Sequence, residues 1–279
     1  MKFSIYQGYE KYLQPGVIWA VIILGLFLLC AIFPAAISGN ENSKRYKPFL
    51  YPTSDHILGT DDVGHDIFSV VVYSARVSLI IAFSAGFISV MIGLVIGLAA
   101  GYFSGIIDDL LMGLTDLVLI VPKIPVIILI AAITRPSILL LILVLGFLSW
   151  ETTARMVRSR VMQVTGSGFI LSSKTFGFSP GWIMTRDIVP VLYPVILPKL
   201  MIVVAGALIS EASLSFLGLS DPTMNSWGKM IADAFSHGGF IRNMWWWYGP
   251  PAICIILMIL ACVRIGSIWE TKQTERAFD

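Results

Sequence analysis

The sequence predicts an all-α membrane protein with six transmembrane helices. Of its 279 residues, 57% are hydrophobic and only 13% are charged, and the mean hydropathy is +0.84. An ordinary soluble domain carries roughly 25% charged residues, so this chain has too few charged side chains to cover a water-exposed surface. The apolar residues also gather in runs of about 20, which is the length that crosses the hydrocarbon core as a helix.

The apolar runs divide the chain into spans. They cover residues 16–37, 77–103, 110–133, 137–157, 191–217 and 249–268. The first run continues to Ile37, which is longer than the apolar core of a cleaved signal peptide, so we expect a retained helix. Residues 1–76 then form an N-terminal tail, the first helix and an outer segment. Residues 77–279 form a five-helix core.

The third run contains a break in its helical pattern. Pro122 and Pro125 flank Lys123 in the stretch "IVPKIPV". Each proline removes a backbone donor, and inside a membrane the freed carbonyl groups need neighbours or a polar cavity. We therefore expect a broken helix that lines a pathway.

The basic residues predict the orientation of the spans, because cytoplasmic loops carry an excess of Lys and Arg. The bias favours both termini in the cytoplasm, with residues 38–76 and 218–248 outside and residues 158–190 as the longest inner loop. The inner residues are Lys2, Lys11, Arg155, Arg158, Arg160, Lys174, Arg186, Lys272 and Arg276. The outer residues are Lys44, Arg45, Lys47, Arg76, Arg135, Lys229 and Arg242.

Several classes of function find no support in the sequence. The net charge of +2 is spread over loops and forms no basic tract for nucleic acid. Cys30, Cys254 and Cys262 lie in apolar runs, with no C-x-x-C spacing, so we expect neither disulfides nor a zinc site. No G-x-x-x-x-G-K-[ST] motif occurs, so we expect this chain not to hydrolyse ATP.

An acidic cluster with histidines precedes the second apolar run. Two interpretations are open: ligands for a divalent cation, or helix caps and turns with bends at Gly59 and Gly64. The turn interpretation is favoured, and no metal ligand is predicted. The cluster consists of Asp55, His56, Asp61, Asp62, His65 and Asp66.

The longest inner loop contains a polar stretch, Ser172–Pro194. Gly177 relieves the backbone, and Ser179-Pro180 is typical of a helix start. This pattern predicts two short helices joined by a turn. Two short helices with apolar faces cannot both bury them within one loop, so we expect one face to dock on a soluble partner.

This loop resembles the cytoplasmic coupling loop of ABC importer permeases, whose pattern is E-A-A-x-x-x-G followed by an apolar helix and Pro. Leu171-Ser172-Ser173 stands where E-A-A would. Residues Leu58–Leu79 resemble the L-G-T-D-x-x-G-R-D signature of the dipeptide, oligopeptide and nickel permeases, second or "C" subunit. Residues Glu211–Ile231 resemble the E-x-x-L-S-F-L-G-L-G…W-G segment of the same family.

The resemblance implies a type I importer fold with a homologous second permease, two cytoplasmic ATPases and an extracytoplasmic binding protein. This chain would bind no cofactor, and ATP and Mg²⁺ would bind the ATPases. The resemblance also implies a set of residues that couple the loop to an ATPase: Ser172, Ser173, Lys174, Gly177, Phe178, Ser179, Trp182, Ile183 and Arg186.

Ionisable residues in apolar runs are costly and usually face a cavity or a partner. Glu211 is the best candidate for the translocation pathway, because it also falls in a matched motif. For Lys199 and Arg264 there is an alternative to a role in the pathway, since long basic side chains can extend to the membrane–water interface. The pathway residues that we predict are Asp116, Lys123, Glu211 and Ser215.

The function we expect is therefore a permease subunit of an ATP-driven importer in the cytoplasmic membrane. Short peptides lead as the substrate, followed by nickel or metal chelates and oligosaccharides. An ion-coupled secondary transporter would show paired broken helices, whereas this sequence shows one break. An intramembrane enzyme would need catalytic pairs in the spans, and the sequence shows no such pair.

Overall fold

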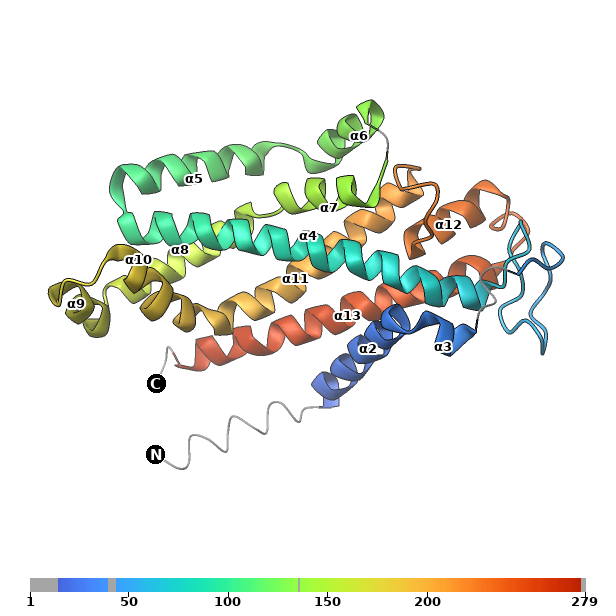
Figure 1. Cartoon of the computed structure of the whole chain (residues 1–279), viewed down its shortest axis with the longest axis horizontal. Coiled ribbons are helices and arrows are strands. Elements are labelled where there is room, and N and C mark those ends of the chain that lie inside the picture. The colour runs from blue at the N-terminus through green and yellow to red at the C-terminus, as the bar shows by residue number, and fades with distance from the viewer. Residues whose placement is uncertain (1–14, 40–43, 135, 277–279) are drawn as a thin grey trace.

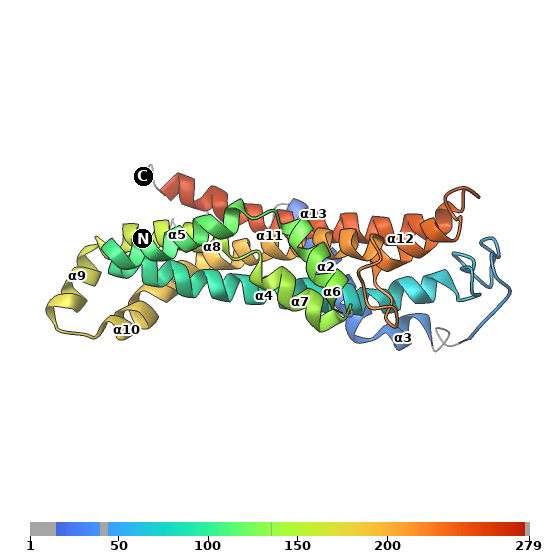
Figure 2. The same cartoon turned by 90° about the horizontal axis from the view of Figure 1, so that it is seen from above.

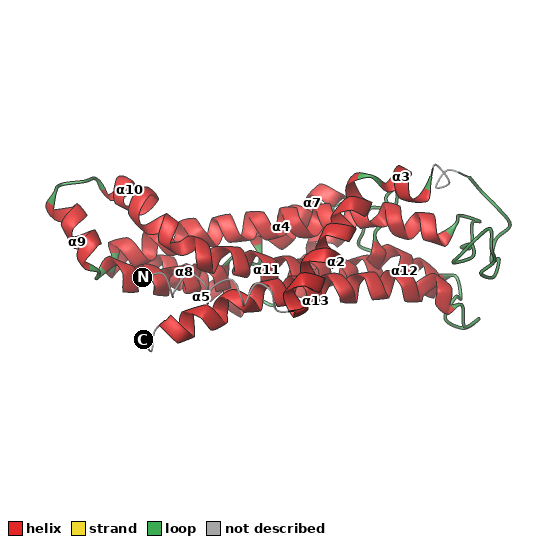
Figure 3. Ribbon diagram, turned by 90° about the horizontal axis from the view of Figure 1, so that it is seen from below, coloured by secondary structure: helices red, strands yellow, loops and turns green. Residues whose placement is uncertain are grey.

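In the computed structural model the chain forms a bundle of long helices that lie side by side (Figure 1). The structure describes residues 15–39, 44–134 and 136–276. Within these ranges the regular elements are helical, and the only β-type pairing is an isolated bridge between Thr60 and Asp66 (Figure 3). The all-α class predicted from the sequence is confirmed.

The helices follow one another in this order: α2 (Pro15–Ile32), α3 (Pro34–Ser38), α4 (Ile67–Phe103), α5 (Gly105–Ile120), α6 (Lys123–Ile133), α7 (Ile138–Phe147), α8 (Glu151–Thr165), α9 (Gly168–Thr175), α10 (Pro180–Trp182), the π-helical segment η2 (Ile183–Ile188), α11 (Val189–Phe216), α12 (Trp227–Ser236) and α13 (Trp245–Arg276).

Three helical stretches among the described residues are long and apolar enough to cross a membrane: Ile67–Phe103, Pro180–Phe216 and Trp245–Ser267. Two bent pairs, α5 with α6 and α7 with α8, bring the number of possible spans to five. The apolar helix Gly16–Ile32 is shorter. The first predicted run contains α2 and the short helix α3, and each of the other five corresponds to one helix or to one bent pair.

Two predicted span starts are wrong by ten residues or more. The second span begins at Ile67 rather than at residue 77, because Asp66 caps the helix by accepting a hydrogen bond of 2.9 Å from the Ser69 backbone N–H. The fifth span begins at Pro180 rather than at residue 191. Both helices begin before their predicted apolar runs, because backbone hydrogen bonding continues into residues that are less hydrophobic.

The predicted break in the third run is confirmed. Helices α5 and α6 meet at an angle of 77°, with Val121 and Pro122 between them. Pro122 lacks the N–H that would continue α5, and its extended backbone allows α6 to start at Lys123. A second bend of 41°, between α7 and α8, was not predicted from the sequence.

Three glycines position α8 against α4. Gly93, Gly97 and Gly101 recur every four residues on one face of α4. A Cβ atom at any of them would collide with α8, at Thr153, Val157 or Val161 respectively. Such small residues let two membrane helices approach closely, so this stripe sets the position of α8 and of the loop that follows it.

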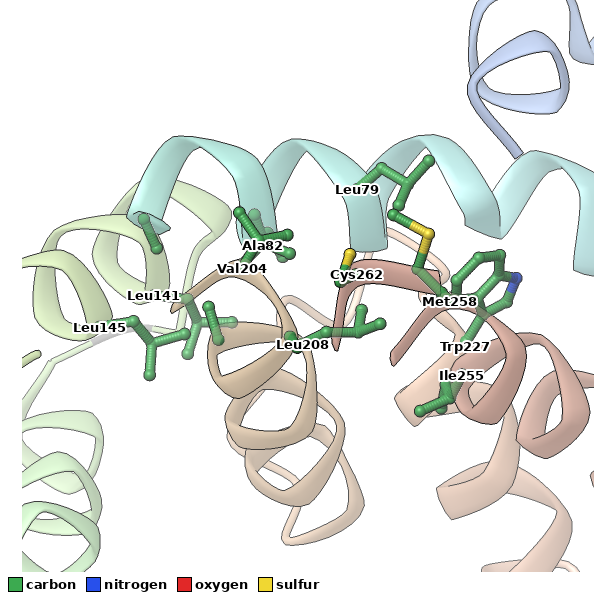
Figure 4. Packing of buried hydrophobic residues seen from close by; sticks show 14 of the residues in the cluster. Leu79, Ala82, Leu141, Leu145, Val204, Leu208, Trp227, Ile255, Met258 and Cys262 are labelled. Carbon is green, nitrogen blue, oxygen red and sulfur yellow. The ribbon is translucent and has the colours of Figure 1, made fainter. Parts of the chain in front are cut away.

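The main core lies where α4, α7, α11 and α13 converge (Figure 4). Leu79 and Ala82 of α4 contact a cluster that includes Leu208 of α11 and Met258 of α13, and Trp227 from the start of α12 closes it. The Trp227 backbone N–H donates to Ser78 Oγ at 3.0 Å, so α12 is fixed to the bundle by polar as well as apolar contacts.

The predicted inner loop and the predicted outer segments lie at opposite ends of the bundle (Figures 1 and 2). Helices α9 and α10 lie at one end, and residues 44–66, α3 and α12 lie at the other. This separation is the one that the charge pattern predicts. Of the basic residues used for that prediction, Lys2, Lys11 and Arg135 lie outside the described residues.

The acidic cluster near α4 forms turns and caps. Gly59 and Gly64 have positive φ angles of 68° and 85°. Asp66 lies 3.0 Å from His56 Nδ1, and Asp61 accepts the His65 backbone N–H at 2.7 Å. In the described ranges no group of three or more His, Cys, Asp or Glu side chains is arranged to hold a metal ion.

Candidate functional site

The segment between α8 and α11 forms two helical arms at one end of the molecule (Figure 2). The first arm is α9. The second arm contains α10 and η2, and Ser179 begins it by accepting a hydrogen bond of 3.3 Å from the Trp182 N–H. We call residues 168–188 the coupling loop from here on. The two arms and the turn between them agree with the sequence prediction.

Gly177 forms the turn between the arms. Its φ angle is +78°, and the N–H groups of Gly177 and Phe178 donate to the carbonyl groups of Lys174 and Ser173. This is the usual way in which a helix ends at a left-handed glycine. No atom lies within 4 Å of a Cβ built at Gly177, so the backbone angle and not close packing requires the glycine.

The second arm is not a separate short helix, which corrects the sequence prediction. It continues into α11 through η2, where the Val189 N–H donates to the carbonyl of Met184, five residues earlier. Pro190 follows and has no N–H to donate, which favours this looser π-helical turn. The coupling loop is therefore joined directly to a membrane span.

Polar and apolar contacts hold the two arms together. Ser173 Oγ donates to Asp187 Oδ2 at 2.7 Å. Ile170, Ile183 and Ile188 are fully buried in one cluster beneath this bond. Ile183 was predicted to couple to a partner, but its buried side chain belongs to this core and not to the surface.

The outer surface of the coupling loop is apolar. Phe176 is 79% exposed, and Phe178 stacks on Trp182 with ring centroids 4.1 Å apart. Large exposed apolar patches mark interaction surfaces. Four other predicted coupling residues are exposed as well: Ser172, Lys174, Ser179 and Arg186. The ammonium group of Lys174 lies over the Tyr102 ring of α4 at 5.1 Å. Phe169 and Leu171 extend the patch.

A cavity of about 530 Å³ lies between α6, α7 and α11. Lys123 lines it, and Lys123 Nζ lies 2.7 Å from Glu151 Oε1 at the start of α8. The broken span thus brings a cation to the cavity wall. The cavity is otherwise largely apolar, with Ser149, Ser210 and Ser213 as its further polar members.

Glu211 and Ser215 lie elsewhere. Both are buried on α11, and Ser215 Oγ donates to Glu211 Oε1 at 2.7 Å. Ser215 also lies 3.5 Å from Ser226, which caps α12. The two predicted residues therefore form a polar link between α11 and α12, and they do not line the cavity at Lys123.

Three acid–base pairs connect α8 to the broken span. Glu151, Arg155 and Arg158 are spaced i, i+4 and i+7, and they pair with Lys123, Asp116 and Asp108 respectively. Asp116 and Arg155 are more than half exposed, whereas Asp108 is nearly buried. The pair of Asp108 and Arg158 was not predicted, although the matched spacing of opposite charges was a usable signal.

A bundle of long apolar helices, with a two-armed loop that projects from one end, is the architecture of a multi-pass membrane protein. The comparison with known families agrees with this class. The chain belongs to the family described as the binding-protein-dependent transport system inner membrane component, which matches residues 93–275. It is therefore a permease subunit of an ABC importer, and such permeases work in general with ATPase and substrate-binding partners.

Named relatives cover most of the chain. It is 32% identical over 250 residues to the dipeptide transport system permease protein DppC of Bacillus subtilis, covering 87% of this chain and 78% of the relative. It is 33% identical over 266 residues to the oligopeptide transport system permease protein OppC of Lactococcus lactis, covering 94% of this chain and 90% of the relative.

A solved structure shares the fold. It shows inward-facing conformations of the MetNI methionine ABC transporter and superposes with a TM-score of 0.57 at 18% identity, over 72% of this chain and 95% of the other. At this identity the similarity concerns the fold alone. The predicted fold of a type I ABC importer permease is confirmed.

Proposed function

We propose that this permease passes short peptides across the cytoplasmic membrane. The observation that carries the proposal is the similarity, over most of the chain, to permeases named for dipeptide and oligopeptide transport. Uptake of labelled trialanine into vesicles that contain the complete importer and ATP tests this proposal. Uptake of labelled nickel or of a labelled oligosaccharide, with no uptake of trialanine, would instead place the substrate in one of those classes.

We further propose that the coupling loop docks on a cytoplasmic ATPase. Support comes from its exposed aromatic patch and from its continuity with α11 through η2. The assembly would contain a homologous second permease, two ATPases that bind ATP and Mg²⁺, and an extracytoplasmic binding protein. This chain would hydrolyse no ATP itself. When the ATPases close, the coupling loop would move, and rigid-body motion of the helices would alternate access.

The orientation that we propose places both termini and the coupling loop in the cytoplasm. The distribution of basic residues and the opposite positions of residues 44–66 and α9 support it (Figure 1). Cysteines at Ser54 and Ser167 should react with a membrane-impermeant reagent from opposite sides. Labelling of both from outside intact cells would overturn this orientation.

A further inference from the structure

The cavity at Lys123 has the size and composition of a small-molecule site. Its volume of about 530 Å³ lies within the range of about 300–1,000 Å³ typical of such sites. Apolar side chains such as Leu145, Ile209 and Leu214 form most of its wall. Among the described residues that line it, Lys123 alone carries a formal charge.

In the ion pair at this cavity, the cation Lys123 is exposed and the anion Glu151 is buried. The Lys123 side chain is 40% exposed, whereas that of Glu151 is 1% exposed. One oxygen of Glu151 accepts from Lys123, and the other, Oε2, has no hydrogen-bond partner within the described part of the chain. The buried carboxylate thus holds the ammonium group in place, and a ligand that enters the cavity meets the positive group.

The backbone at the start of α6 and two serines of α11 provide further polar groups at the cavity. Helix α6 begins at Lys123 with no side-chain cap, and Pro125 in its first turn has no N–H, so the N–H groups of Lys123 and Ile124 are the two that favour an anion at the same place. Ser210 and Ser213 donate their hydroxyl protons to the carbonyls of Gly206 and Ile209 at 2.9 and 2.8 Å. Their lone pairs therefore remain available to accept from N–H groups of a ligand.

We propose that this cavity is a transit subsite in which Lys123 binds the carboxylate of a small solute while the apolar wall accommodates its side chains. The assignment of that solute as a short peptide rests on the proposed function. The recognition of a carboxylate rests on the geometry alone. Glu151 acts as a positioning residue that keeps the ammonium group directed at the cavity.

Protection from labelling tests the subsite in the complete importer. Ser213 lines the cavity and is exposed, so Ser213→Cys should react with a neutral maleimide, and the parent chain with Cys30, Cys254 and Cys262 sets the background. We expect trialanine to slow this labelling at a concentration about tenfold or more below that needed for trialanine amide, because a charge-assisted hydrogen bond is lost in the amide.

The paired variant Lys123→Met with Glu151→Gln removes both charges and leaves neither one buried alone. In this variant we expect trialanine and trialanine amide to protect the cysteine at position 213 equally. Replacing Lys123 by Arg instead of Met, with Glu151 kept, should restore the preference for the carboxylate. Equal protection in the Ser213→Cys chain that keeps Lys123 and Glu151, an unchanged preference when the paired substitutions are added to it, or a Ser213→Cys chain that does not react with the maleimide would each overturn the subsite. Uptake of trialanine is measured separately, so failure of the peptide assignment is distinguishable from failure of the subsite.

Discussion

Ser173 of α9 donates a hydrogen bond of 2.7 Å to Asp187 of η2, and this bond joins the two arms of the coupling loop. Ser173 Oγ also lies 3.2 Å from the Phe169 carbonyl of α9, whereas the hydroxyl of the neighbouring Ser172 donates to the carbonyl of Gly168 within the same helix. Two adjacent serines of the same matched motif thus have different roles. One braces the loop, and the other is exposed at the surface.

The brace predicts different effects for two alanine substitutions. Ser173→Ala should destabilise the contact between the arms by about 1 kcal/mol, because it removes a hydrogen bond to a carboxylate that is partly exposed. Hydrogen–deuterium exchange of the loop should rise and recovery of the ATPase should fall. Ser172→Ala is the matched control and should change neither. Identical exchange in the two variants would show that the bond does not brace the loop.

The turn at Gly177 makes a second prediction. Gly177→Trp should insert into the membrane and pair with the second permease, since the spans are unchanged, yet lose ATPase binding and uptake. The reason is the positive φ angle, which costs a non-glycine residue about 1–2 kcal/mol. Gly181→Ala is the control, because Gly181 has ordinary helical geometry and open space. Normal pull-down and normal uptake by Gly177→Trp would remove the docking role from this loop.

The ion pairs along α8 should contribute unequally to stability. Asp108 accepts from both Nε and Nη2 of Arg158, and Asp108→Ala should cost about 1–3 kcal/mol because it leaves a guanidinium group without its partner. Asp116→Ala removes an exposed pair and should cost about 0–1 kcal/mol. Apparent Tm values of the purified importer measure both. A larger loss for Asp116→Ala would contradict this ranking.

Two carboxyl groups outside the spans should give opposite pH effects. Burial raises the pKa of Asp233 in α12, so its contribution is most favourable when it is protonated and is lost as pH rises through the raised pKa. The Thr223 hydroxyl and N–H lower the pKa of Asp221, so its contribution is present above the ordinary Asp pKa and is lost as pH falls through the lowered one.

Replacing each aspartate by the neutral residue asparagine tests the predicted direction of its pH effect. At neutral pH Asp233→Asn should raise the apparent Tm, because it removes a partly buried charge, whereas Asp221→Asn should lower it. Profiles of apparent Tm against pH for the two variants are the measurement. Shifts in the same direction would show that the two environments do not differ as described.

Glu211→Gln should reduce uptake while the importer still assembles. A glutamine keeps the oxygen that accepts from Ser215, but it introduces an NH₂ group beside Ser226 and removes the carboxylate. Ser215→Ala, which leaves the carboxylate in place, should have a smaller effect. The ratio of uptake to ATPase activity is the measurement, and normal uptake by Glu211→Gln would argue against a role in transport.

The local features of the coupling loop could be predicted because they depend on neighbouring residues. Gly177 ends α9, Ser179 and Pro180 begin the next arm, and Pro122 breaks the third span, as the sequence indicated. The brace from Ser173 to Asp187 could not be predicted in this way. It joins residues 14 positions apart, and their meeting depends on the turn and on the isoleucine cluster beneath it.

The sequence by itself determined the helical class, the six apolar segments, the two ends of the molecule and the family, because hydropathy, charge bias and motif spacing are properties of the linear chain. The tertiary structure alone decided which ionisable groups meet. It separated Lys123 from Glu211, buried Ile183, and paired Arg158 with Asp108 across 50 residues. The physical reason is helix packing: the glycine stripe of α4 fixes where α8 lies, and that position decides which charges come within reach of one another.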